Sequence, residues 1–216
     1  MRPQVLQPMV QALGLGLPVY IPCGPVQHED GSCSWWAVDP GHRAARLAAG
    51  PSDLFDRHPP ERPAARAVLA ATMAQARREH PGARLVLAGY SQGGMLLMDH
   101  LLTQDEKRDD IAGVALLSST CIALDEWLPH VARLRGLPAL VTHGHHDGDL
   151  SFGAGERLRD LLVKGGAEVA WLPFDGGHEM PLVVWRALRR FVTKLVSEPS
   201  ASIVPPTTMG GDGPRA

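Results

Sequence analysis

The chain has few cysteines: only Cys23, Cys33 and Cys121 occur among its 216 residues. Their number is odd, and no pair has the C-x-x-C spacing of a zinc site, so the sequence predicts neither a disulfide framework nor a structural metal. Cysteine usage of this kind favours a reducing, cytoplasmic location. We expect Cys121 to be a small buried residue of the core.

The sequence also lacks an excess of charge of one sign and a long hydrophobic run. Its 21 basic and 23 acidic residues give a formal net charge of −2, and this balance disfavours nucleic acid as a partner. No apolar run reaches the ~18 residues needed to cross a bilayer, and no basic segment followed by an apolar leader opens the chain. We therefore expect no stable membrane insertion and small, neutral or weakly charged ligands.

The pattern that is present is that of an α/β protein, with 44% hydrophobic residues. Apolar runs typical of buried parallel strands separate stretches with helical spacing, so the sequence predicts a three-layer α/β/α sandwich around a mainly parallel sheet. We expect one domain over residues 1–196 and a disordered, Pro- and Gly-rich tail over 197–216. The expected strands are 18–21, 84–89, 111–117, 137–142 and 168–174.

The most informative motif is Gly89-Tyr90-Ser91-Gln92-Gly93, which follows an apolar run directly. A G-x-S-x-G segment between a strand and a helix forms a nucleophile elbow, which lifts the serine onto the N-terminus of the helix. We expect Gly89 and Gly93 to have no room for a side chain. The amide of Gln92 is the candidate oxyanion-hole donor. Ser91 is thus a candidate nucleophile, and the alternative is an ordinary turn serine.

A serine nucleophile needs a histidine to take its proton and a carboxylate to orient that histidine. On hydrolase-type sheets the order is serine, acid, histidine, with each group in a loop after a strand. Asp147 and His178 follow two successive expected strands in this order. We expect Asp147 to orient His178 and His178 to act as the general base. Asp149 and Asp175 are rival acids, and a turn aspartate and a helix-flanking histidine are the structural alternatives.

The loop around Asp147 also invites a metal hypothesis, because imidazole and carboxylate groups bind zinc and iron. Close neighbours on one short loop rarely converge without a distant third ligand, so we expect no metal, and His143 is interpreted as a structural residue at a strand end. The groups concerned are His143, His145, His146, Asp147 and Asp149.

Trp35 and Trp36 are the candidate substrate-binding residues, because aromatic side chains can line an acyl or alcohol pocket. The alternative is that both pack over the edge of the sheet.

Three motifs, Gly-Tyr-Ser91-Gln-Gly-Gly, His-Gly-His-His-Asp147 and Gly-Gly-His178-Glu, together resemble the phospholipase/carboxylesterase family of α/β-hydrolases, which includes acyl-protein thioesterases and bacterial serine esterases. The resemblance runs from about residue 4 to 195. The stretch from Trp35 to Asp39 is similar to the tryptophan-containing loop of that family. The resemblance implies hydrolysis of short- to medium-chain acyl esters or thioesters through an acyl-enzyme intermediate, without a metal or organic cofactor.

The chain departs from that family at its beginning. Family members begin with a strand that ends in a His-Gly loop and supplies a second oxyanion-hole amide, and nothing in this sequence corresponds to it, so we expect an N-terminally shortened fold. In the family's sheet that strand lies between the strand at 18–21 and the elbow strand. Its absence would leave unpaired backbone groups or force those two strands together.

Loss of one oxyanion donor typically lowers turnover by roughly 10²–10³-fold. Two explanations stay open: a coding start upstream of Met1, or a slow or non-catalytic protein.

The sequence supports three hypotheses about function. The first is a serine carboxylesterase, and the second is a hydrolase-fold protein that binds an acyl ligand without efficient catalysis. The third is a metal-dependent hydrolase that uses the 143–149 loop. The sequence leaves the leaving group and the oligomeric state open, with a homodimer among the options.

Overall fold

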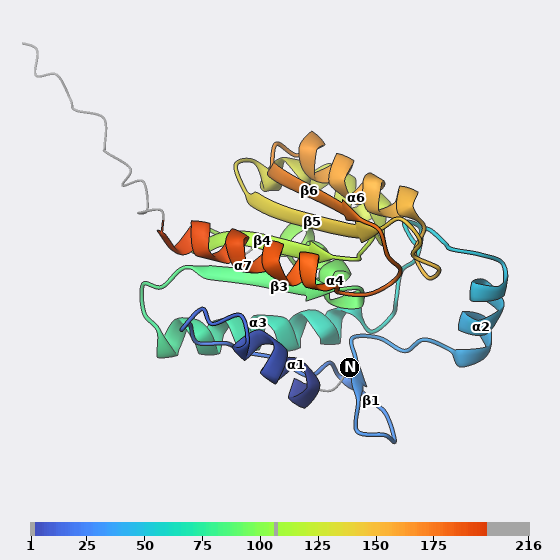
Figure 1. Cartoon of the computed structure of the whole chain (residues 1–216), viewed down its shortest axis with the longest axis horizontal. Coiled ribbons are helices and arrows are strands. Elements are labelled where there is room, and N and C mark those ends of the chain that lie inside the picture. The colour runs from blue at the N-terminus through green and yellow to red at the C-terminus, as the bar shows by residue number, and fades with distance from the viewer. Residues whose placement is uncertain (1–2, 106–107, 198–216) are drawn as a thin grey trace, which may run out of the picture.

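A computed structural model of the chain describes residues 3–105 and 108–197. Its main sheet has four parallel strands in the order β3-β4-β5-β6 (Figure 1). These strands lie within two residues of the expected ones, so four of the five strand predictions are confirmed. The strands are β3 (Leu85–Tyr90), β4 (Ile111–Leu117), β5 (Pro138–Gly144) and β6 (Glu168–Phe174).

Helices cover both faces of this sheet, which confirms the three-layer α/β/α architecture (Figure 1). Helices α3, α4 and α6 share one hydrophobic cluster with the sheet, and α1 and α7 share another on the opposite face. The helices are α1 (Pro3–Gln11), α2 (Pro40–Ala48), α3 (Arg62–Glu79), α4 (Gln92–Thr103), α5 (Leu124–Trp127), the 3-10 helix η1 (Leu128–Leu134), α6 (Phe152–Lys164) and α7 (Leu182–Ser197). Helix α2 is not among the elements that the sequence indicated.

The burial of β4 on both of its faces explains why this strand is apolar throughout. All seven of its residues are buried, and successive side chains of a strand point to opposite faces. Val114 and Leu116 join the cluster of α3, α4 and α6, whereas Ala115 and Leu117 join that of α1 and α7. A strand covered by helices on both faces therefore has no polar alternation.

Residues 18–21, expected to be a strand, form no strand pairing, and this prediction is wrong. Strand formation requires a hydrogen-bonded neighbour, and among the described residues β3 pairs with β4 and not with this segment. Both 18–21 and β3 line one cavity of about 1610 Å³ that lies between them. In the part of the chain that the structure describes, β3 pairs with β4 and no strand pairs with its other edge.

Cys23 and Cys33 form a disulfide, with Cα atoms 5.8 Å apart. The expectation that the chain has no disulfide is therefore wrong. A short antiparallel hairpin of β1 (Val26–Gln27) and β2 (Cys33–Ser34) brings the two thiols together, and a spacing of ten residues gives no local signal of such a hairpin. The expected reducing location loses its support, because disulfides persist in oxidising compartments. Cys121 is buried as expected, and burial raises the pKa of its thiol to about 12.

None of the helices within the described ranges is long and apolar enough to cross a membrane. The expected tail lies, from residue 198 onward, outside the described residues.

Candidate active site

Ser91 lies at a sharp turn between β3 and α4. It has φ 52° and ψ −118°, a positive φ that is uncommon for a residue with a side chain and is found where the surrounding structure enforces it. A Cβ atom at Gly89 would lie 2.4 Å from the backbone carbonyl carbon of Gly93, so the expected steric role of Gly89 is confirmed. The turn therefore holds Ser91 at the carboxyl end of the sheet.

The same expectation is wrong for Gly93. The nearest atom to a Cβ there would be the indole nitrogen Nε1 of Trp35 at 3.7 Å, an ordinary contact. Gly94 is the tight position, because its Cβ would lie 2.6 Å from the Oγ of Ser119. Ser119 is buried after β4 and donates a hydrogen bond to the Ser91 carbonyl at 3.0 Å, so the first turn of α4 packs closely on that loop.

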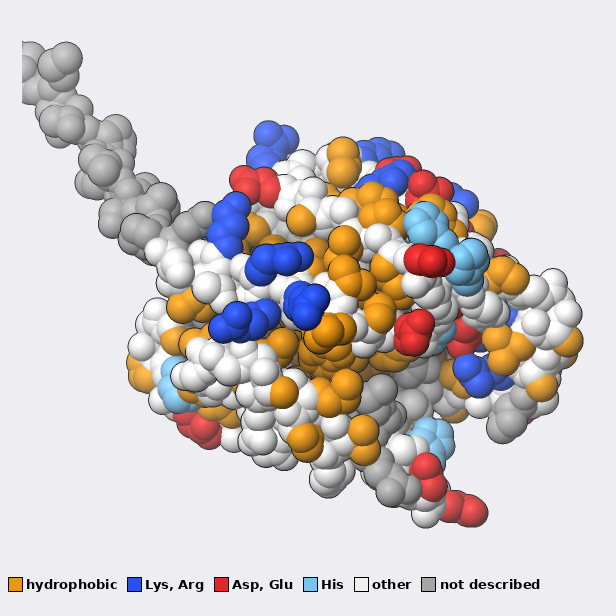
Figure 2. Space-filling model, viewed as in Figure 1, with side chains coloured by type: hydrophobic (Ala, Val, Ile, Leu, Met, Phe, Trp, Pro, Cys, Tyr) orange, Lys and Arg blue, Asp and Glu red, His pale blue; other side chains and the backbone are white. Residues whose placement is uncertain are grey.

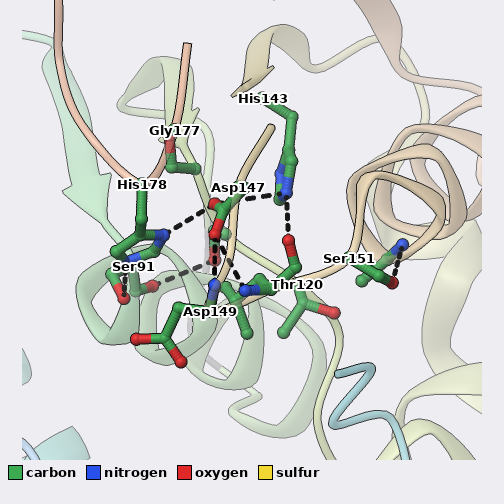
Figure 3. A network of polar contacts seen from close by, with 12 residues as sticks. Ser91, Thr120, His143, Asp147, Asp149, Ser151, Gly177 and His178 are labelled. Atoms are coloured by element: carbon green, nitrogen blue, oxygen red, sulfur yellow. Dashed lines mark hydrogen bonds and ion pairs between the residues drawn. The ribbon is translucent and has the colours of Figure 1, made fainter. Parts of the chain in front are cut away.

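Ser91, His178 and Asp147 are joined by a chain of hydrogen bonds (Figure 3). Ser91 Oγ lies 3.0 Å from His178 Nε2, and His178 Nδ1 lies 2.7 Å from Asp147 Oδ2. With the proton on Nδ1, the imidazole donates to the carboxylate and its Nε2 accepts from the serine hydroxyl. The three residues come from loops after β3, β6 and β5, whose carboxyl ends meet at one edge of the parallel sheet.

Asp147 is held as an anion by its surroundings. Its Oδ1 accepts hydrogen bonds from the amides of Asp149 at 2.8 Å and Leu150 at 2.9 Å, and its side chain is fully buried. Burial alone would raise the pKa of the carboxyl, but the hydrogen bonds from His178 and from these amides outweigh burial and lower the pKa below its ordinary value. The carboxylate is therefore charged near neutral pH and fixes the orientation of the imidazole.

The two rival acids have other partners. Asp149 forms ion pairs with Arg43 at 2.7 Å and with Arg46 on α2. Asp175 is exposed and lies 2.9 Å from His146 Nε2. Neither carboxylate therefore has His178 as its partner, whereas Asp147 does.

The histidines of the 143–149 loop do not converge on one point. His143 is buried, with Nε2 3.2 Å from the Leu150 carbonyl and 3.5 Å from Asp147 Oδ2. His145 instead stacks on Phe152, with ring centroids 4.4 Å apart. Within residues 3–105 and 108–197, no group of three or more His, Cys, Asp or Glu side chains is arranged to hold a metal ion.

Two residues, Tyr90 and Gln92, make contacts around the site that the sequence did not indicate. The Tyr90 hydroxyl donates to the backbone carbonyl of His178 at 2.7 Å, and its ring centroid lies 5.1 Å from the imidazole. Burial raises the pKa of Tyr90 to about 12, so it remains a donor. The Gln92 side chain accepts from the Trp35 amide at 3.1 Å and donates to the Trp36 carbonyl at 3.4 Å. The G-x-S-x-G pattern leaves both positions variable and so carries no signal for these contacts.

Trp35 and Trp36 both line the cavity, which also reaches Ser91 and His178. Trp36 is only 5% exposed and belongs to the core, and Trp35 packs against that core. Gln92 is the first residue of α4, so its amide has no intrahelical acceptor. A carbonyl oxygen bound next to Ser91 could accept a hydrogen bond from this amide.

Comparisons with solved structures show the same fold. Esterase PE8 superposes with a TM-score of 0.70 at 20% identity, covering 90% of this chain and 87% of that one. SOBER1 of Arabidopsis thaliana gives 0.66 at 18% identity, over 91% and 94% of the two chains. A carboxylesterase from Mesorhizobium loti gives 0.67 at 19% identity, over 88% and 82%. At these identities the likeness establishes the α/β-hydrolase fold and no more.

Sequence comparisons identify a family. Acyl-protein thioesterase 1 of Neurospora crassa is 30% identical over 118 residues, which are 53% of this chain and 47% of that protein, so the chain spans about half the length of this relative. Residues 65–196 match the family described as Phospholipase/Carboxylesterase. Because that match includes more than half of the chain, with the elbow and the loops of Asp147 and His178, the chain belongs to the phospholipase/carboxylesterase family.

Proposed function

We propose that this chain is a serine hydrolase that cleaves carboxylic esters or thioesters of short- to medium-chain acyl groups. The observation that carries the proposal is the chain of hydrogen bonds from Ser91 through His178 to the buried Asp147. A hydroxyl with an imidazole at 3.0 Å, itself oriented by a carboxylate, is the arrangement that activates a serine nucleophile.

The proposed reaction has two halves. Ser91 Oγ attacks the acyl carbonyl carbon while its proton moves to His178 Nε2, and the oxyanion that forms accepts a hydrogen bond from the Gln92 amide. The tetrahedral intermediate then expels the alcohol or thiol, which takes the proton from His178. Water, deprotonated by His178, attacks the acyl-enzyme and releases the acid, which restores the Ser91 hydroxyl. Asp147 stays ionised and stabilises the imidazolium in both halves.

A fluorophosphonate probe tests the nucleophile. We expect it to label the wild-type chain and not Ser91→Ala, and we expect Ser91→Ala and His178→Ala to lower the hydrolysis of p-nitrophenyl butyrate by at least roughly 10³-fold. A chelator should leave turnover unchanged. Equal labelling of wild type and Ser91→Ala would rule the proposal out. Acyl thioesters are a second substrate to assay, given the name of the Neurospora crassa relative.

A second candidate, a hydrolase-fold protein that binds an acyl ligand without efficient catalysis, is favoured by the apolar cavity that reaches Ser91. It predicts that a fatty acid binds the chain tightly while neither ester nor thioester is turned over. Clear turnover that disappears in both Ser91→Ala and His178→Ala would refute it.

A further inference from the structure

The loop between β6 and α7 carries His178 and belongs to neither a helix nor a strand. Gly176 and Gly177 precede the histidine, and glycine leaves the backbone more conformational freedom than other residues do. The outer side of the loop lies at the surface: Asp175 and Glu179 are exposed, and Figure 2 shows acidic and histidine side chains at the surface near the ends of β5 and β6. The contacts that fix the imidazole therefore come from the inner side of the loop.

On the side of Asp147, backbone amides hold this loop. The amide of His145 donates to the Phe174 carbonyl, and the amide of His146 donates to the Gly176 carbonyl, both at 2.9 Å. Both donors belong to the loop that carries Asp147. Because they are main-chain groups, the spacing between this carboxylate and the imidazole does not depend on which side chains the two loops have.

Close packing adds to the same contact. A Cβ atom at Gly144, the last residue of β5, would lie 2.4 Å from the carbonyl oxygens of Gly176 and Gly177. Glycine at position 144 thus lets the two backbones approach more closely than any larger residue would. The loop of His178 therefore rests on the end of β5.

On the side of Ser91, hydroxyl groups of side chains hold the loop instead. The Tyr90 hydroxyl donates to the His178 carbonyl at 2.7 Å. The Ser118 hydroxyl donates to the Glu179 carbonyl at 3.3 Å. Among the described residues, these are the hydrogen bonds that tie the loop to β3 and to the end of β4, apart from the bond between Ser91 and His178 itself. The spacing between imidazole and nucleophile therefore depends on two hydroxyl groups.

The sheet fixes both donors. Tyr90 is the last residue of β3, where it pairs with Leu117, and it directly precedes Ser91. Ser118 directly follows β4 and is buried, and its amide donates to the Thr142 carbonyl at 2.9 Å. Its φ of 43° is uncommon for a residue with a side chain, and such backbone persists where the surrounding structure enforces it.

We propose that Tyr90 and Ser118 are positioning residues for His178. Their hydroxyls set the distance between His178 Nε2 and Ser91 Oγ, which is 3.0 Å. The backbone contacts with the Asp147 loop set instead the orientation of the imidazole toward its carboxylate. Tyr90 has the larger effect, because it binds the carbonyl of the histidine itself, and the Ser118 bond is longer than the usual O–H···O separation of about 2.8 Å.

Tyr90→Phe tests this role, because it removes the hydroxyl and keeps the ring, whose centroid lies 5.1 Å from that of the imidazole. We expect His178 to move away from Ser91. A displacement of about 1 Å between reacting groups can lower a rate by roughly 10²-fold. On the proposed function, kcat for p-nitrophenyl butyrate and the rate of fluorophosphonate labelling should therefore both fall by roughly 10–10²-fold, with KM unchanged. Ser118→Ala should lower both rates by less, and a larger loss in Ser118→Ala would refute the main role of Tyr90.

Two NMR signals of His178 report the two contacts of the imidazole without any turnover. The proton of Nδ1, shared with Asp147, gives a downfield signal, and the ¹⁵N shift of Nε2 responds to the hydrogen bond from Ser91. In Tyr90→Phe the Nδ1 proton signal should persist, because the backbone donors of the β5 loop are unchanged. The Nε2 shift should move toward its value in Ser91→Ala, where this hydrogen bond is absent.

Thr103→Val is the matched control. Thr103 is the last residue of α4, and its hydroxyl likewise donates to a backbone carbonyl, that of Asp99 at 2.6 Å. Both NMR signals and both rates should equal those of wild type, and melting temperatures of all variants check folding. Loss of the Nδ1 proton signal together with the Nε2 change in Tyr90→Phe would mean that the hydroxyl holds the loop as a whole, and this result would overturn the proposal.

The two kinds of measurement separate this proposal from the proposed function. If the chain is not an esterase, wild type shows neither labelling nor turnover, whereas the Nε2 change in Tyr90→Phe still supports the positioning role. If wild type is an active esterase and Tyr90→Phe equals it in both rates and both NMR signals, the positioning proposal fails and the esterase proposal stands.

Discussion

At the scale of single residues, the site depends on which of two aspartates meets His178. Asp147 and Asp149 are two positions apart in one loop, and the sequence alone left both as candidate acids. The backbone of the loop decides between them, because the amides of Asp149 and Leu150 turn back to Asp147 Oδ1. Asp149 points instead to α2, where Arg43 and Arg46 bind it. A helix that the sequence analysis did not expect thus provides the partners of the rival acid.

The two aspartates form a matched pair for mutation. We expect Asp147→Asn to lower kcat/KM for p-nitrophenyl butyrate by roughly 10⁴-fold, because an amide cannot hold the imidazole in the required tautomer. Asp149→Asn removes the pairing with the α2 arginines but leaves its backbone amide in place, so we expect a loss below about tenfold. Steady-state kinetics of both variants, with melting temperatures as the folding control, measure the difference. Similar losses in the two variants would contradict the assigned role of Asp147.

At the scale of elements, the elbow of β3 and α4 owes its shape to close packing at Gly89 and Gly94 rather than at Gly93. Both Gly93 and Gly94 lie in the first turn of α4, where alanine is favoured over glycine by up to about 1 kcal/mol. At Gly94 an added methyl group meets the buried side chain of Ser119 at 2.6 Å. Gly93 has only the ordinary contact with Trp35.

Alanine at these two glycines should therefore have opposite effects on stability. We expect Gly94→Ala to destabilise the chain by about 1–3 kcal/mol, since overpacking in a closed core costs about that much. Gly93→Ala should be neutral or slightly stabilising. Urea unfolding followed by tryptophan fluorescence measures both free energies. A Gly93→Ala variant that is the less stable of the two would show that the first turn of α4 packs differently.

The sheet shows what a sequence can and cannot predict. Strands β3 to β6 lie where apolar runs indicated them, and β4 and β5, which are buried along most of their length, show most clearly how burial on both faces makes a strand's own residues apolar. Residues 18–21 have the same local character but form no strand, because pairing depends on a neighbour that is distant in the chain. The Cys23–Cys33 disulfide was missed for the same reason: the hairpin that forms it is a property of the loop as a whole. The order of serine, acid and histidine after successive strands was enough to predict Ser91, Asp147 and His178 as site residues. It carries no information on the contacts of Tyr90 and Gln92.

At the scale of the whole molecule, the buried site links stability to pH in two ranges. Burial lowers the pKa of His143 from 6.5, so the folded chain keeps this imidazole neutral where the unfolded chain binds a proton. The contribution of the neutral His143 side chain to the free energy of unfolding is therefore fully present above about pH 6.5 and declines as the pH falls below that value. The pKa of Asp147 is also lowered, from 3.8, so the stability due to its ionised form is present above that value and is lost as the pH falls through the folded-state pKa.

The free energy of unfolding should therefore fall in two steps on acidification, the first between pH 7 and 5 and the second below pH 4. The first step has a slope of at most about 1.4 kcal/mol per pH unit for one group, and His143→Gln should reduce it, because glutamine does not titrate. Asp147→Asn should keep the first step and reduce the second. Urea unfolding at pH 7, 5 and 3.5 for the three chains measures both steps. Identical pH profiles for wild type and His143→Gln would mean that His143 takes up its proton equally well in the folded chain, contrary to its burial against the Leu150 carbonyl and Asp147.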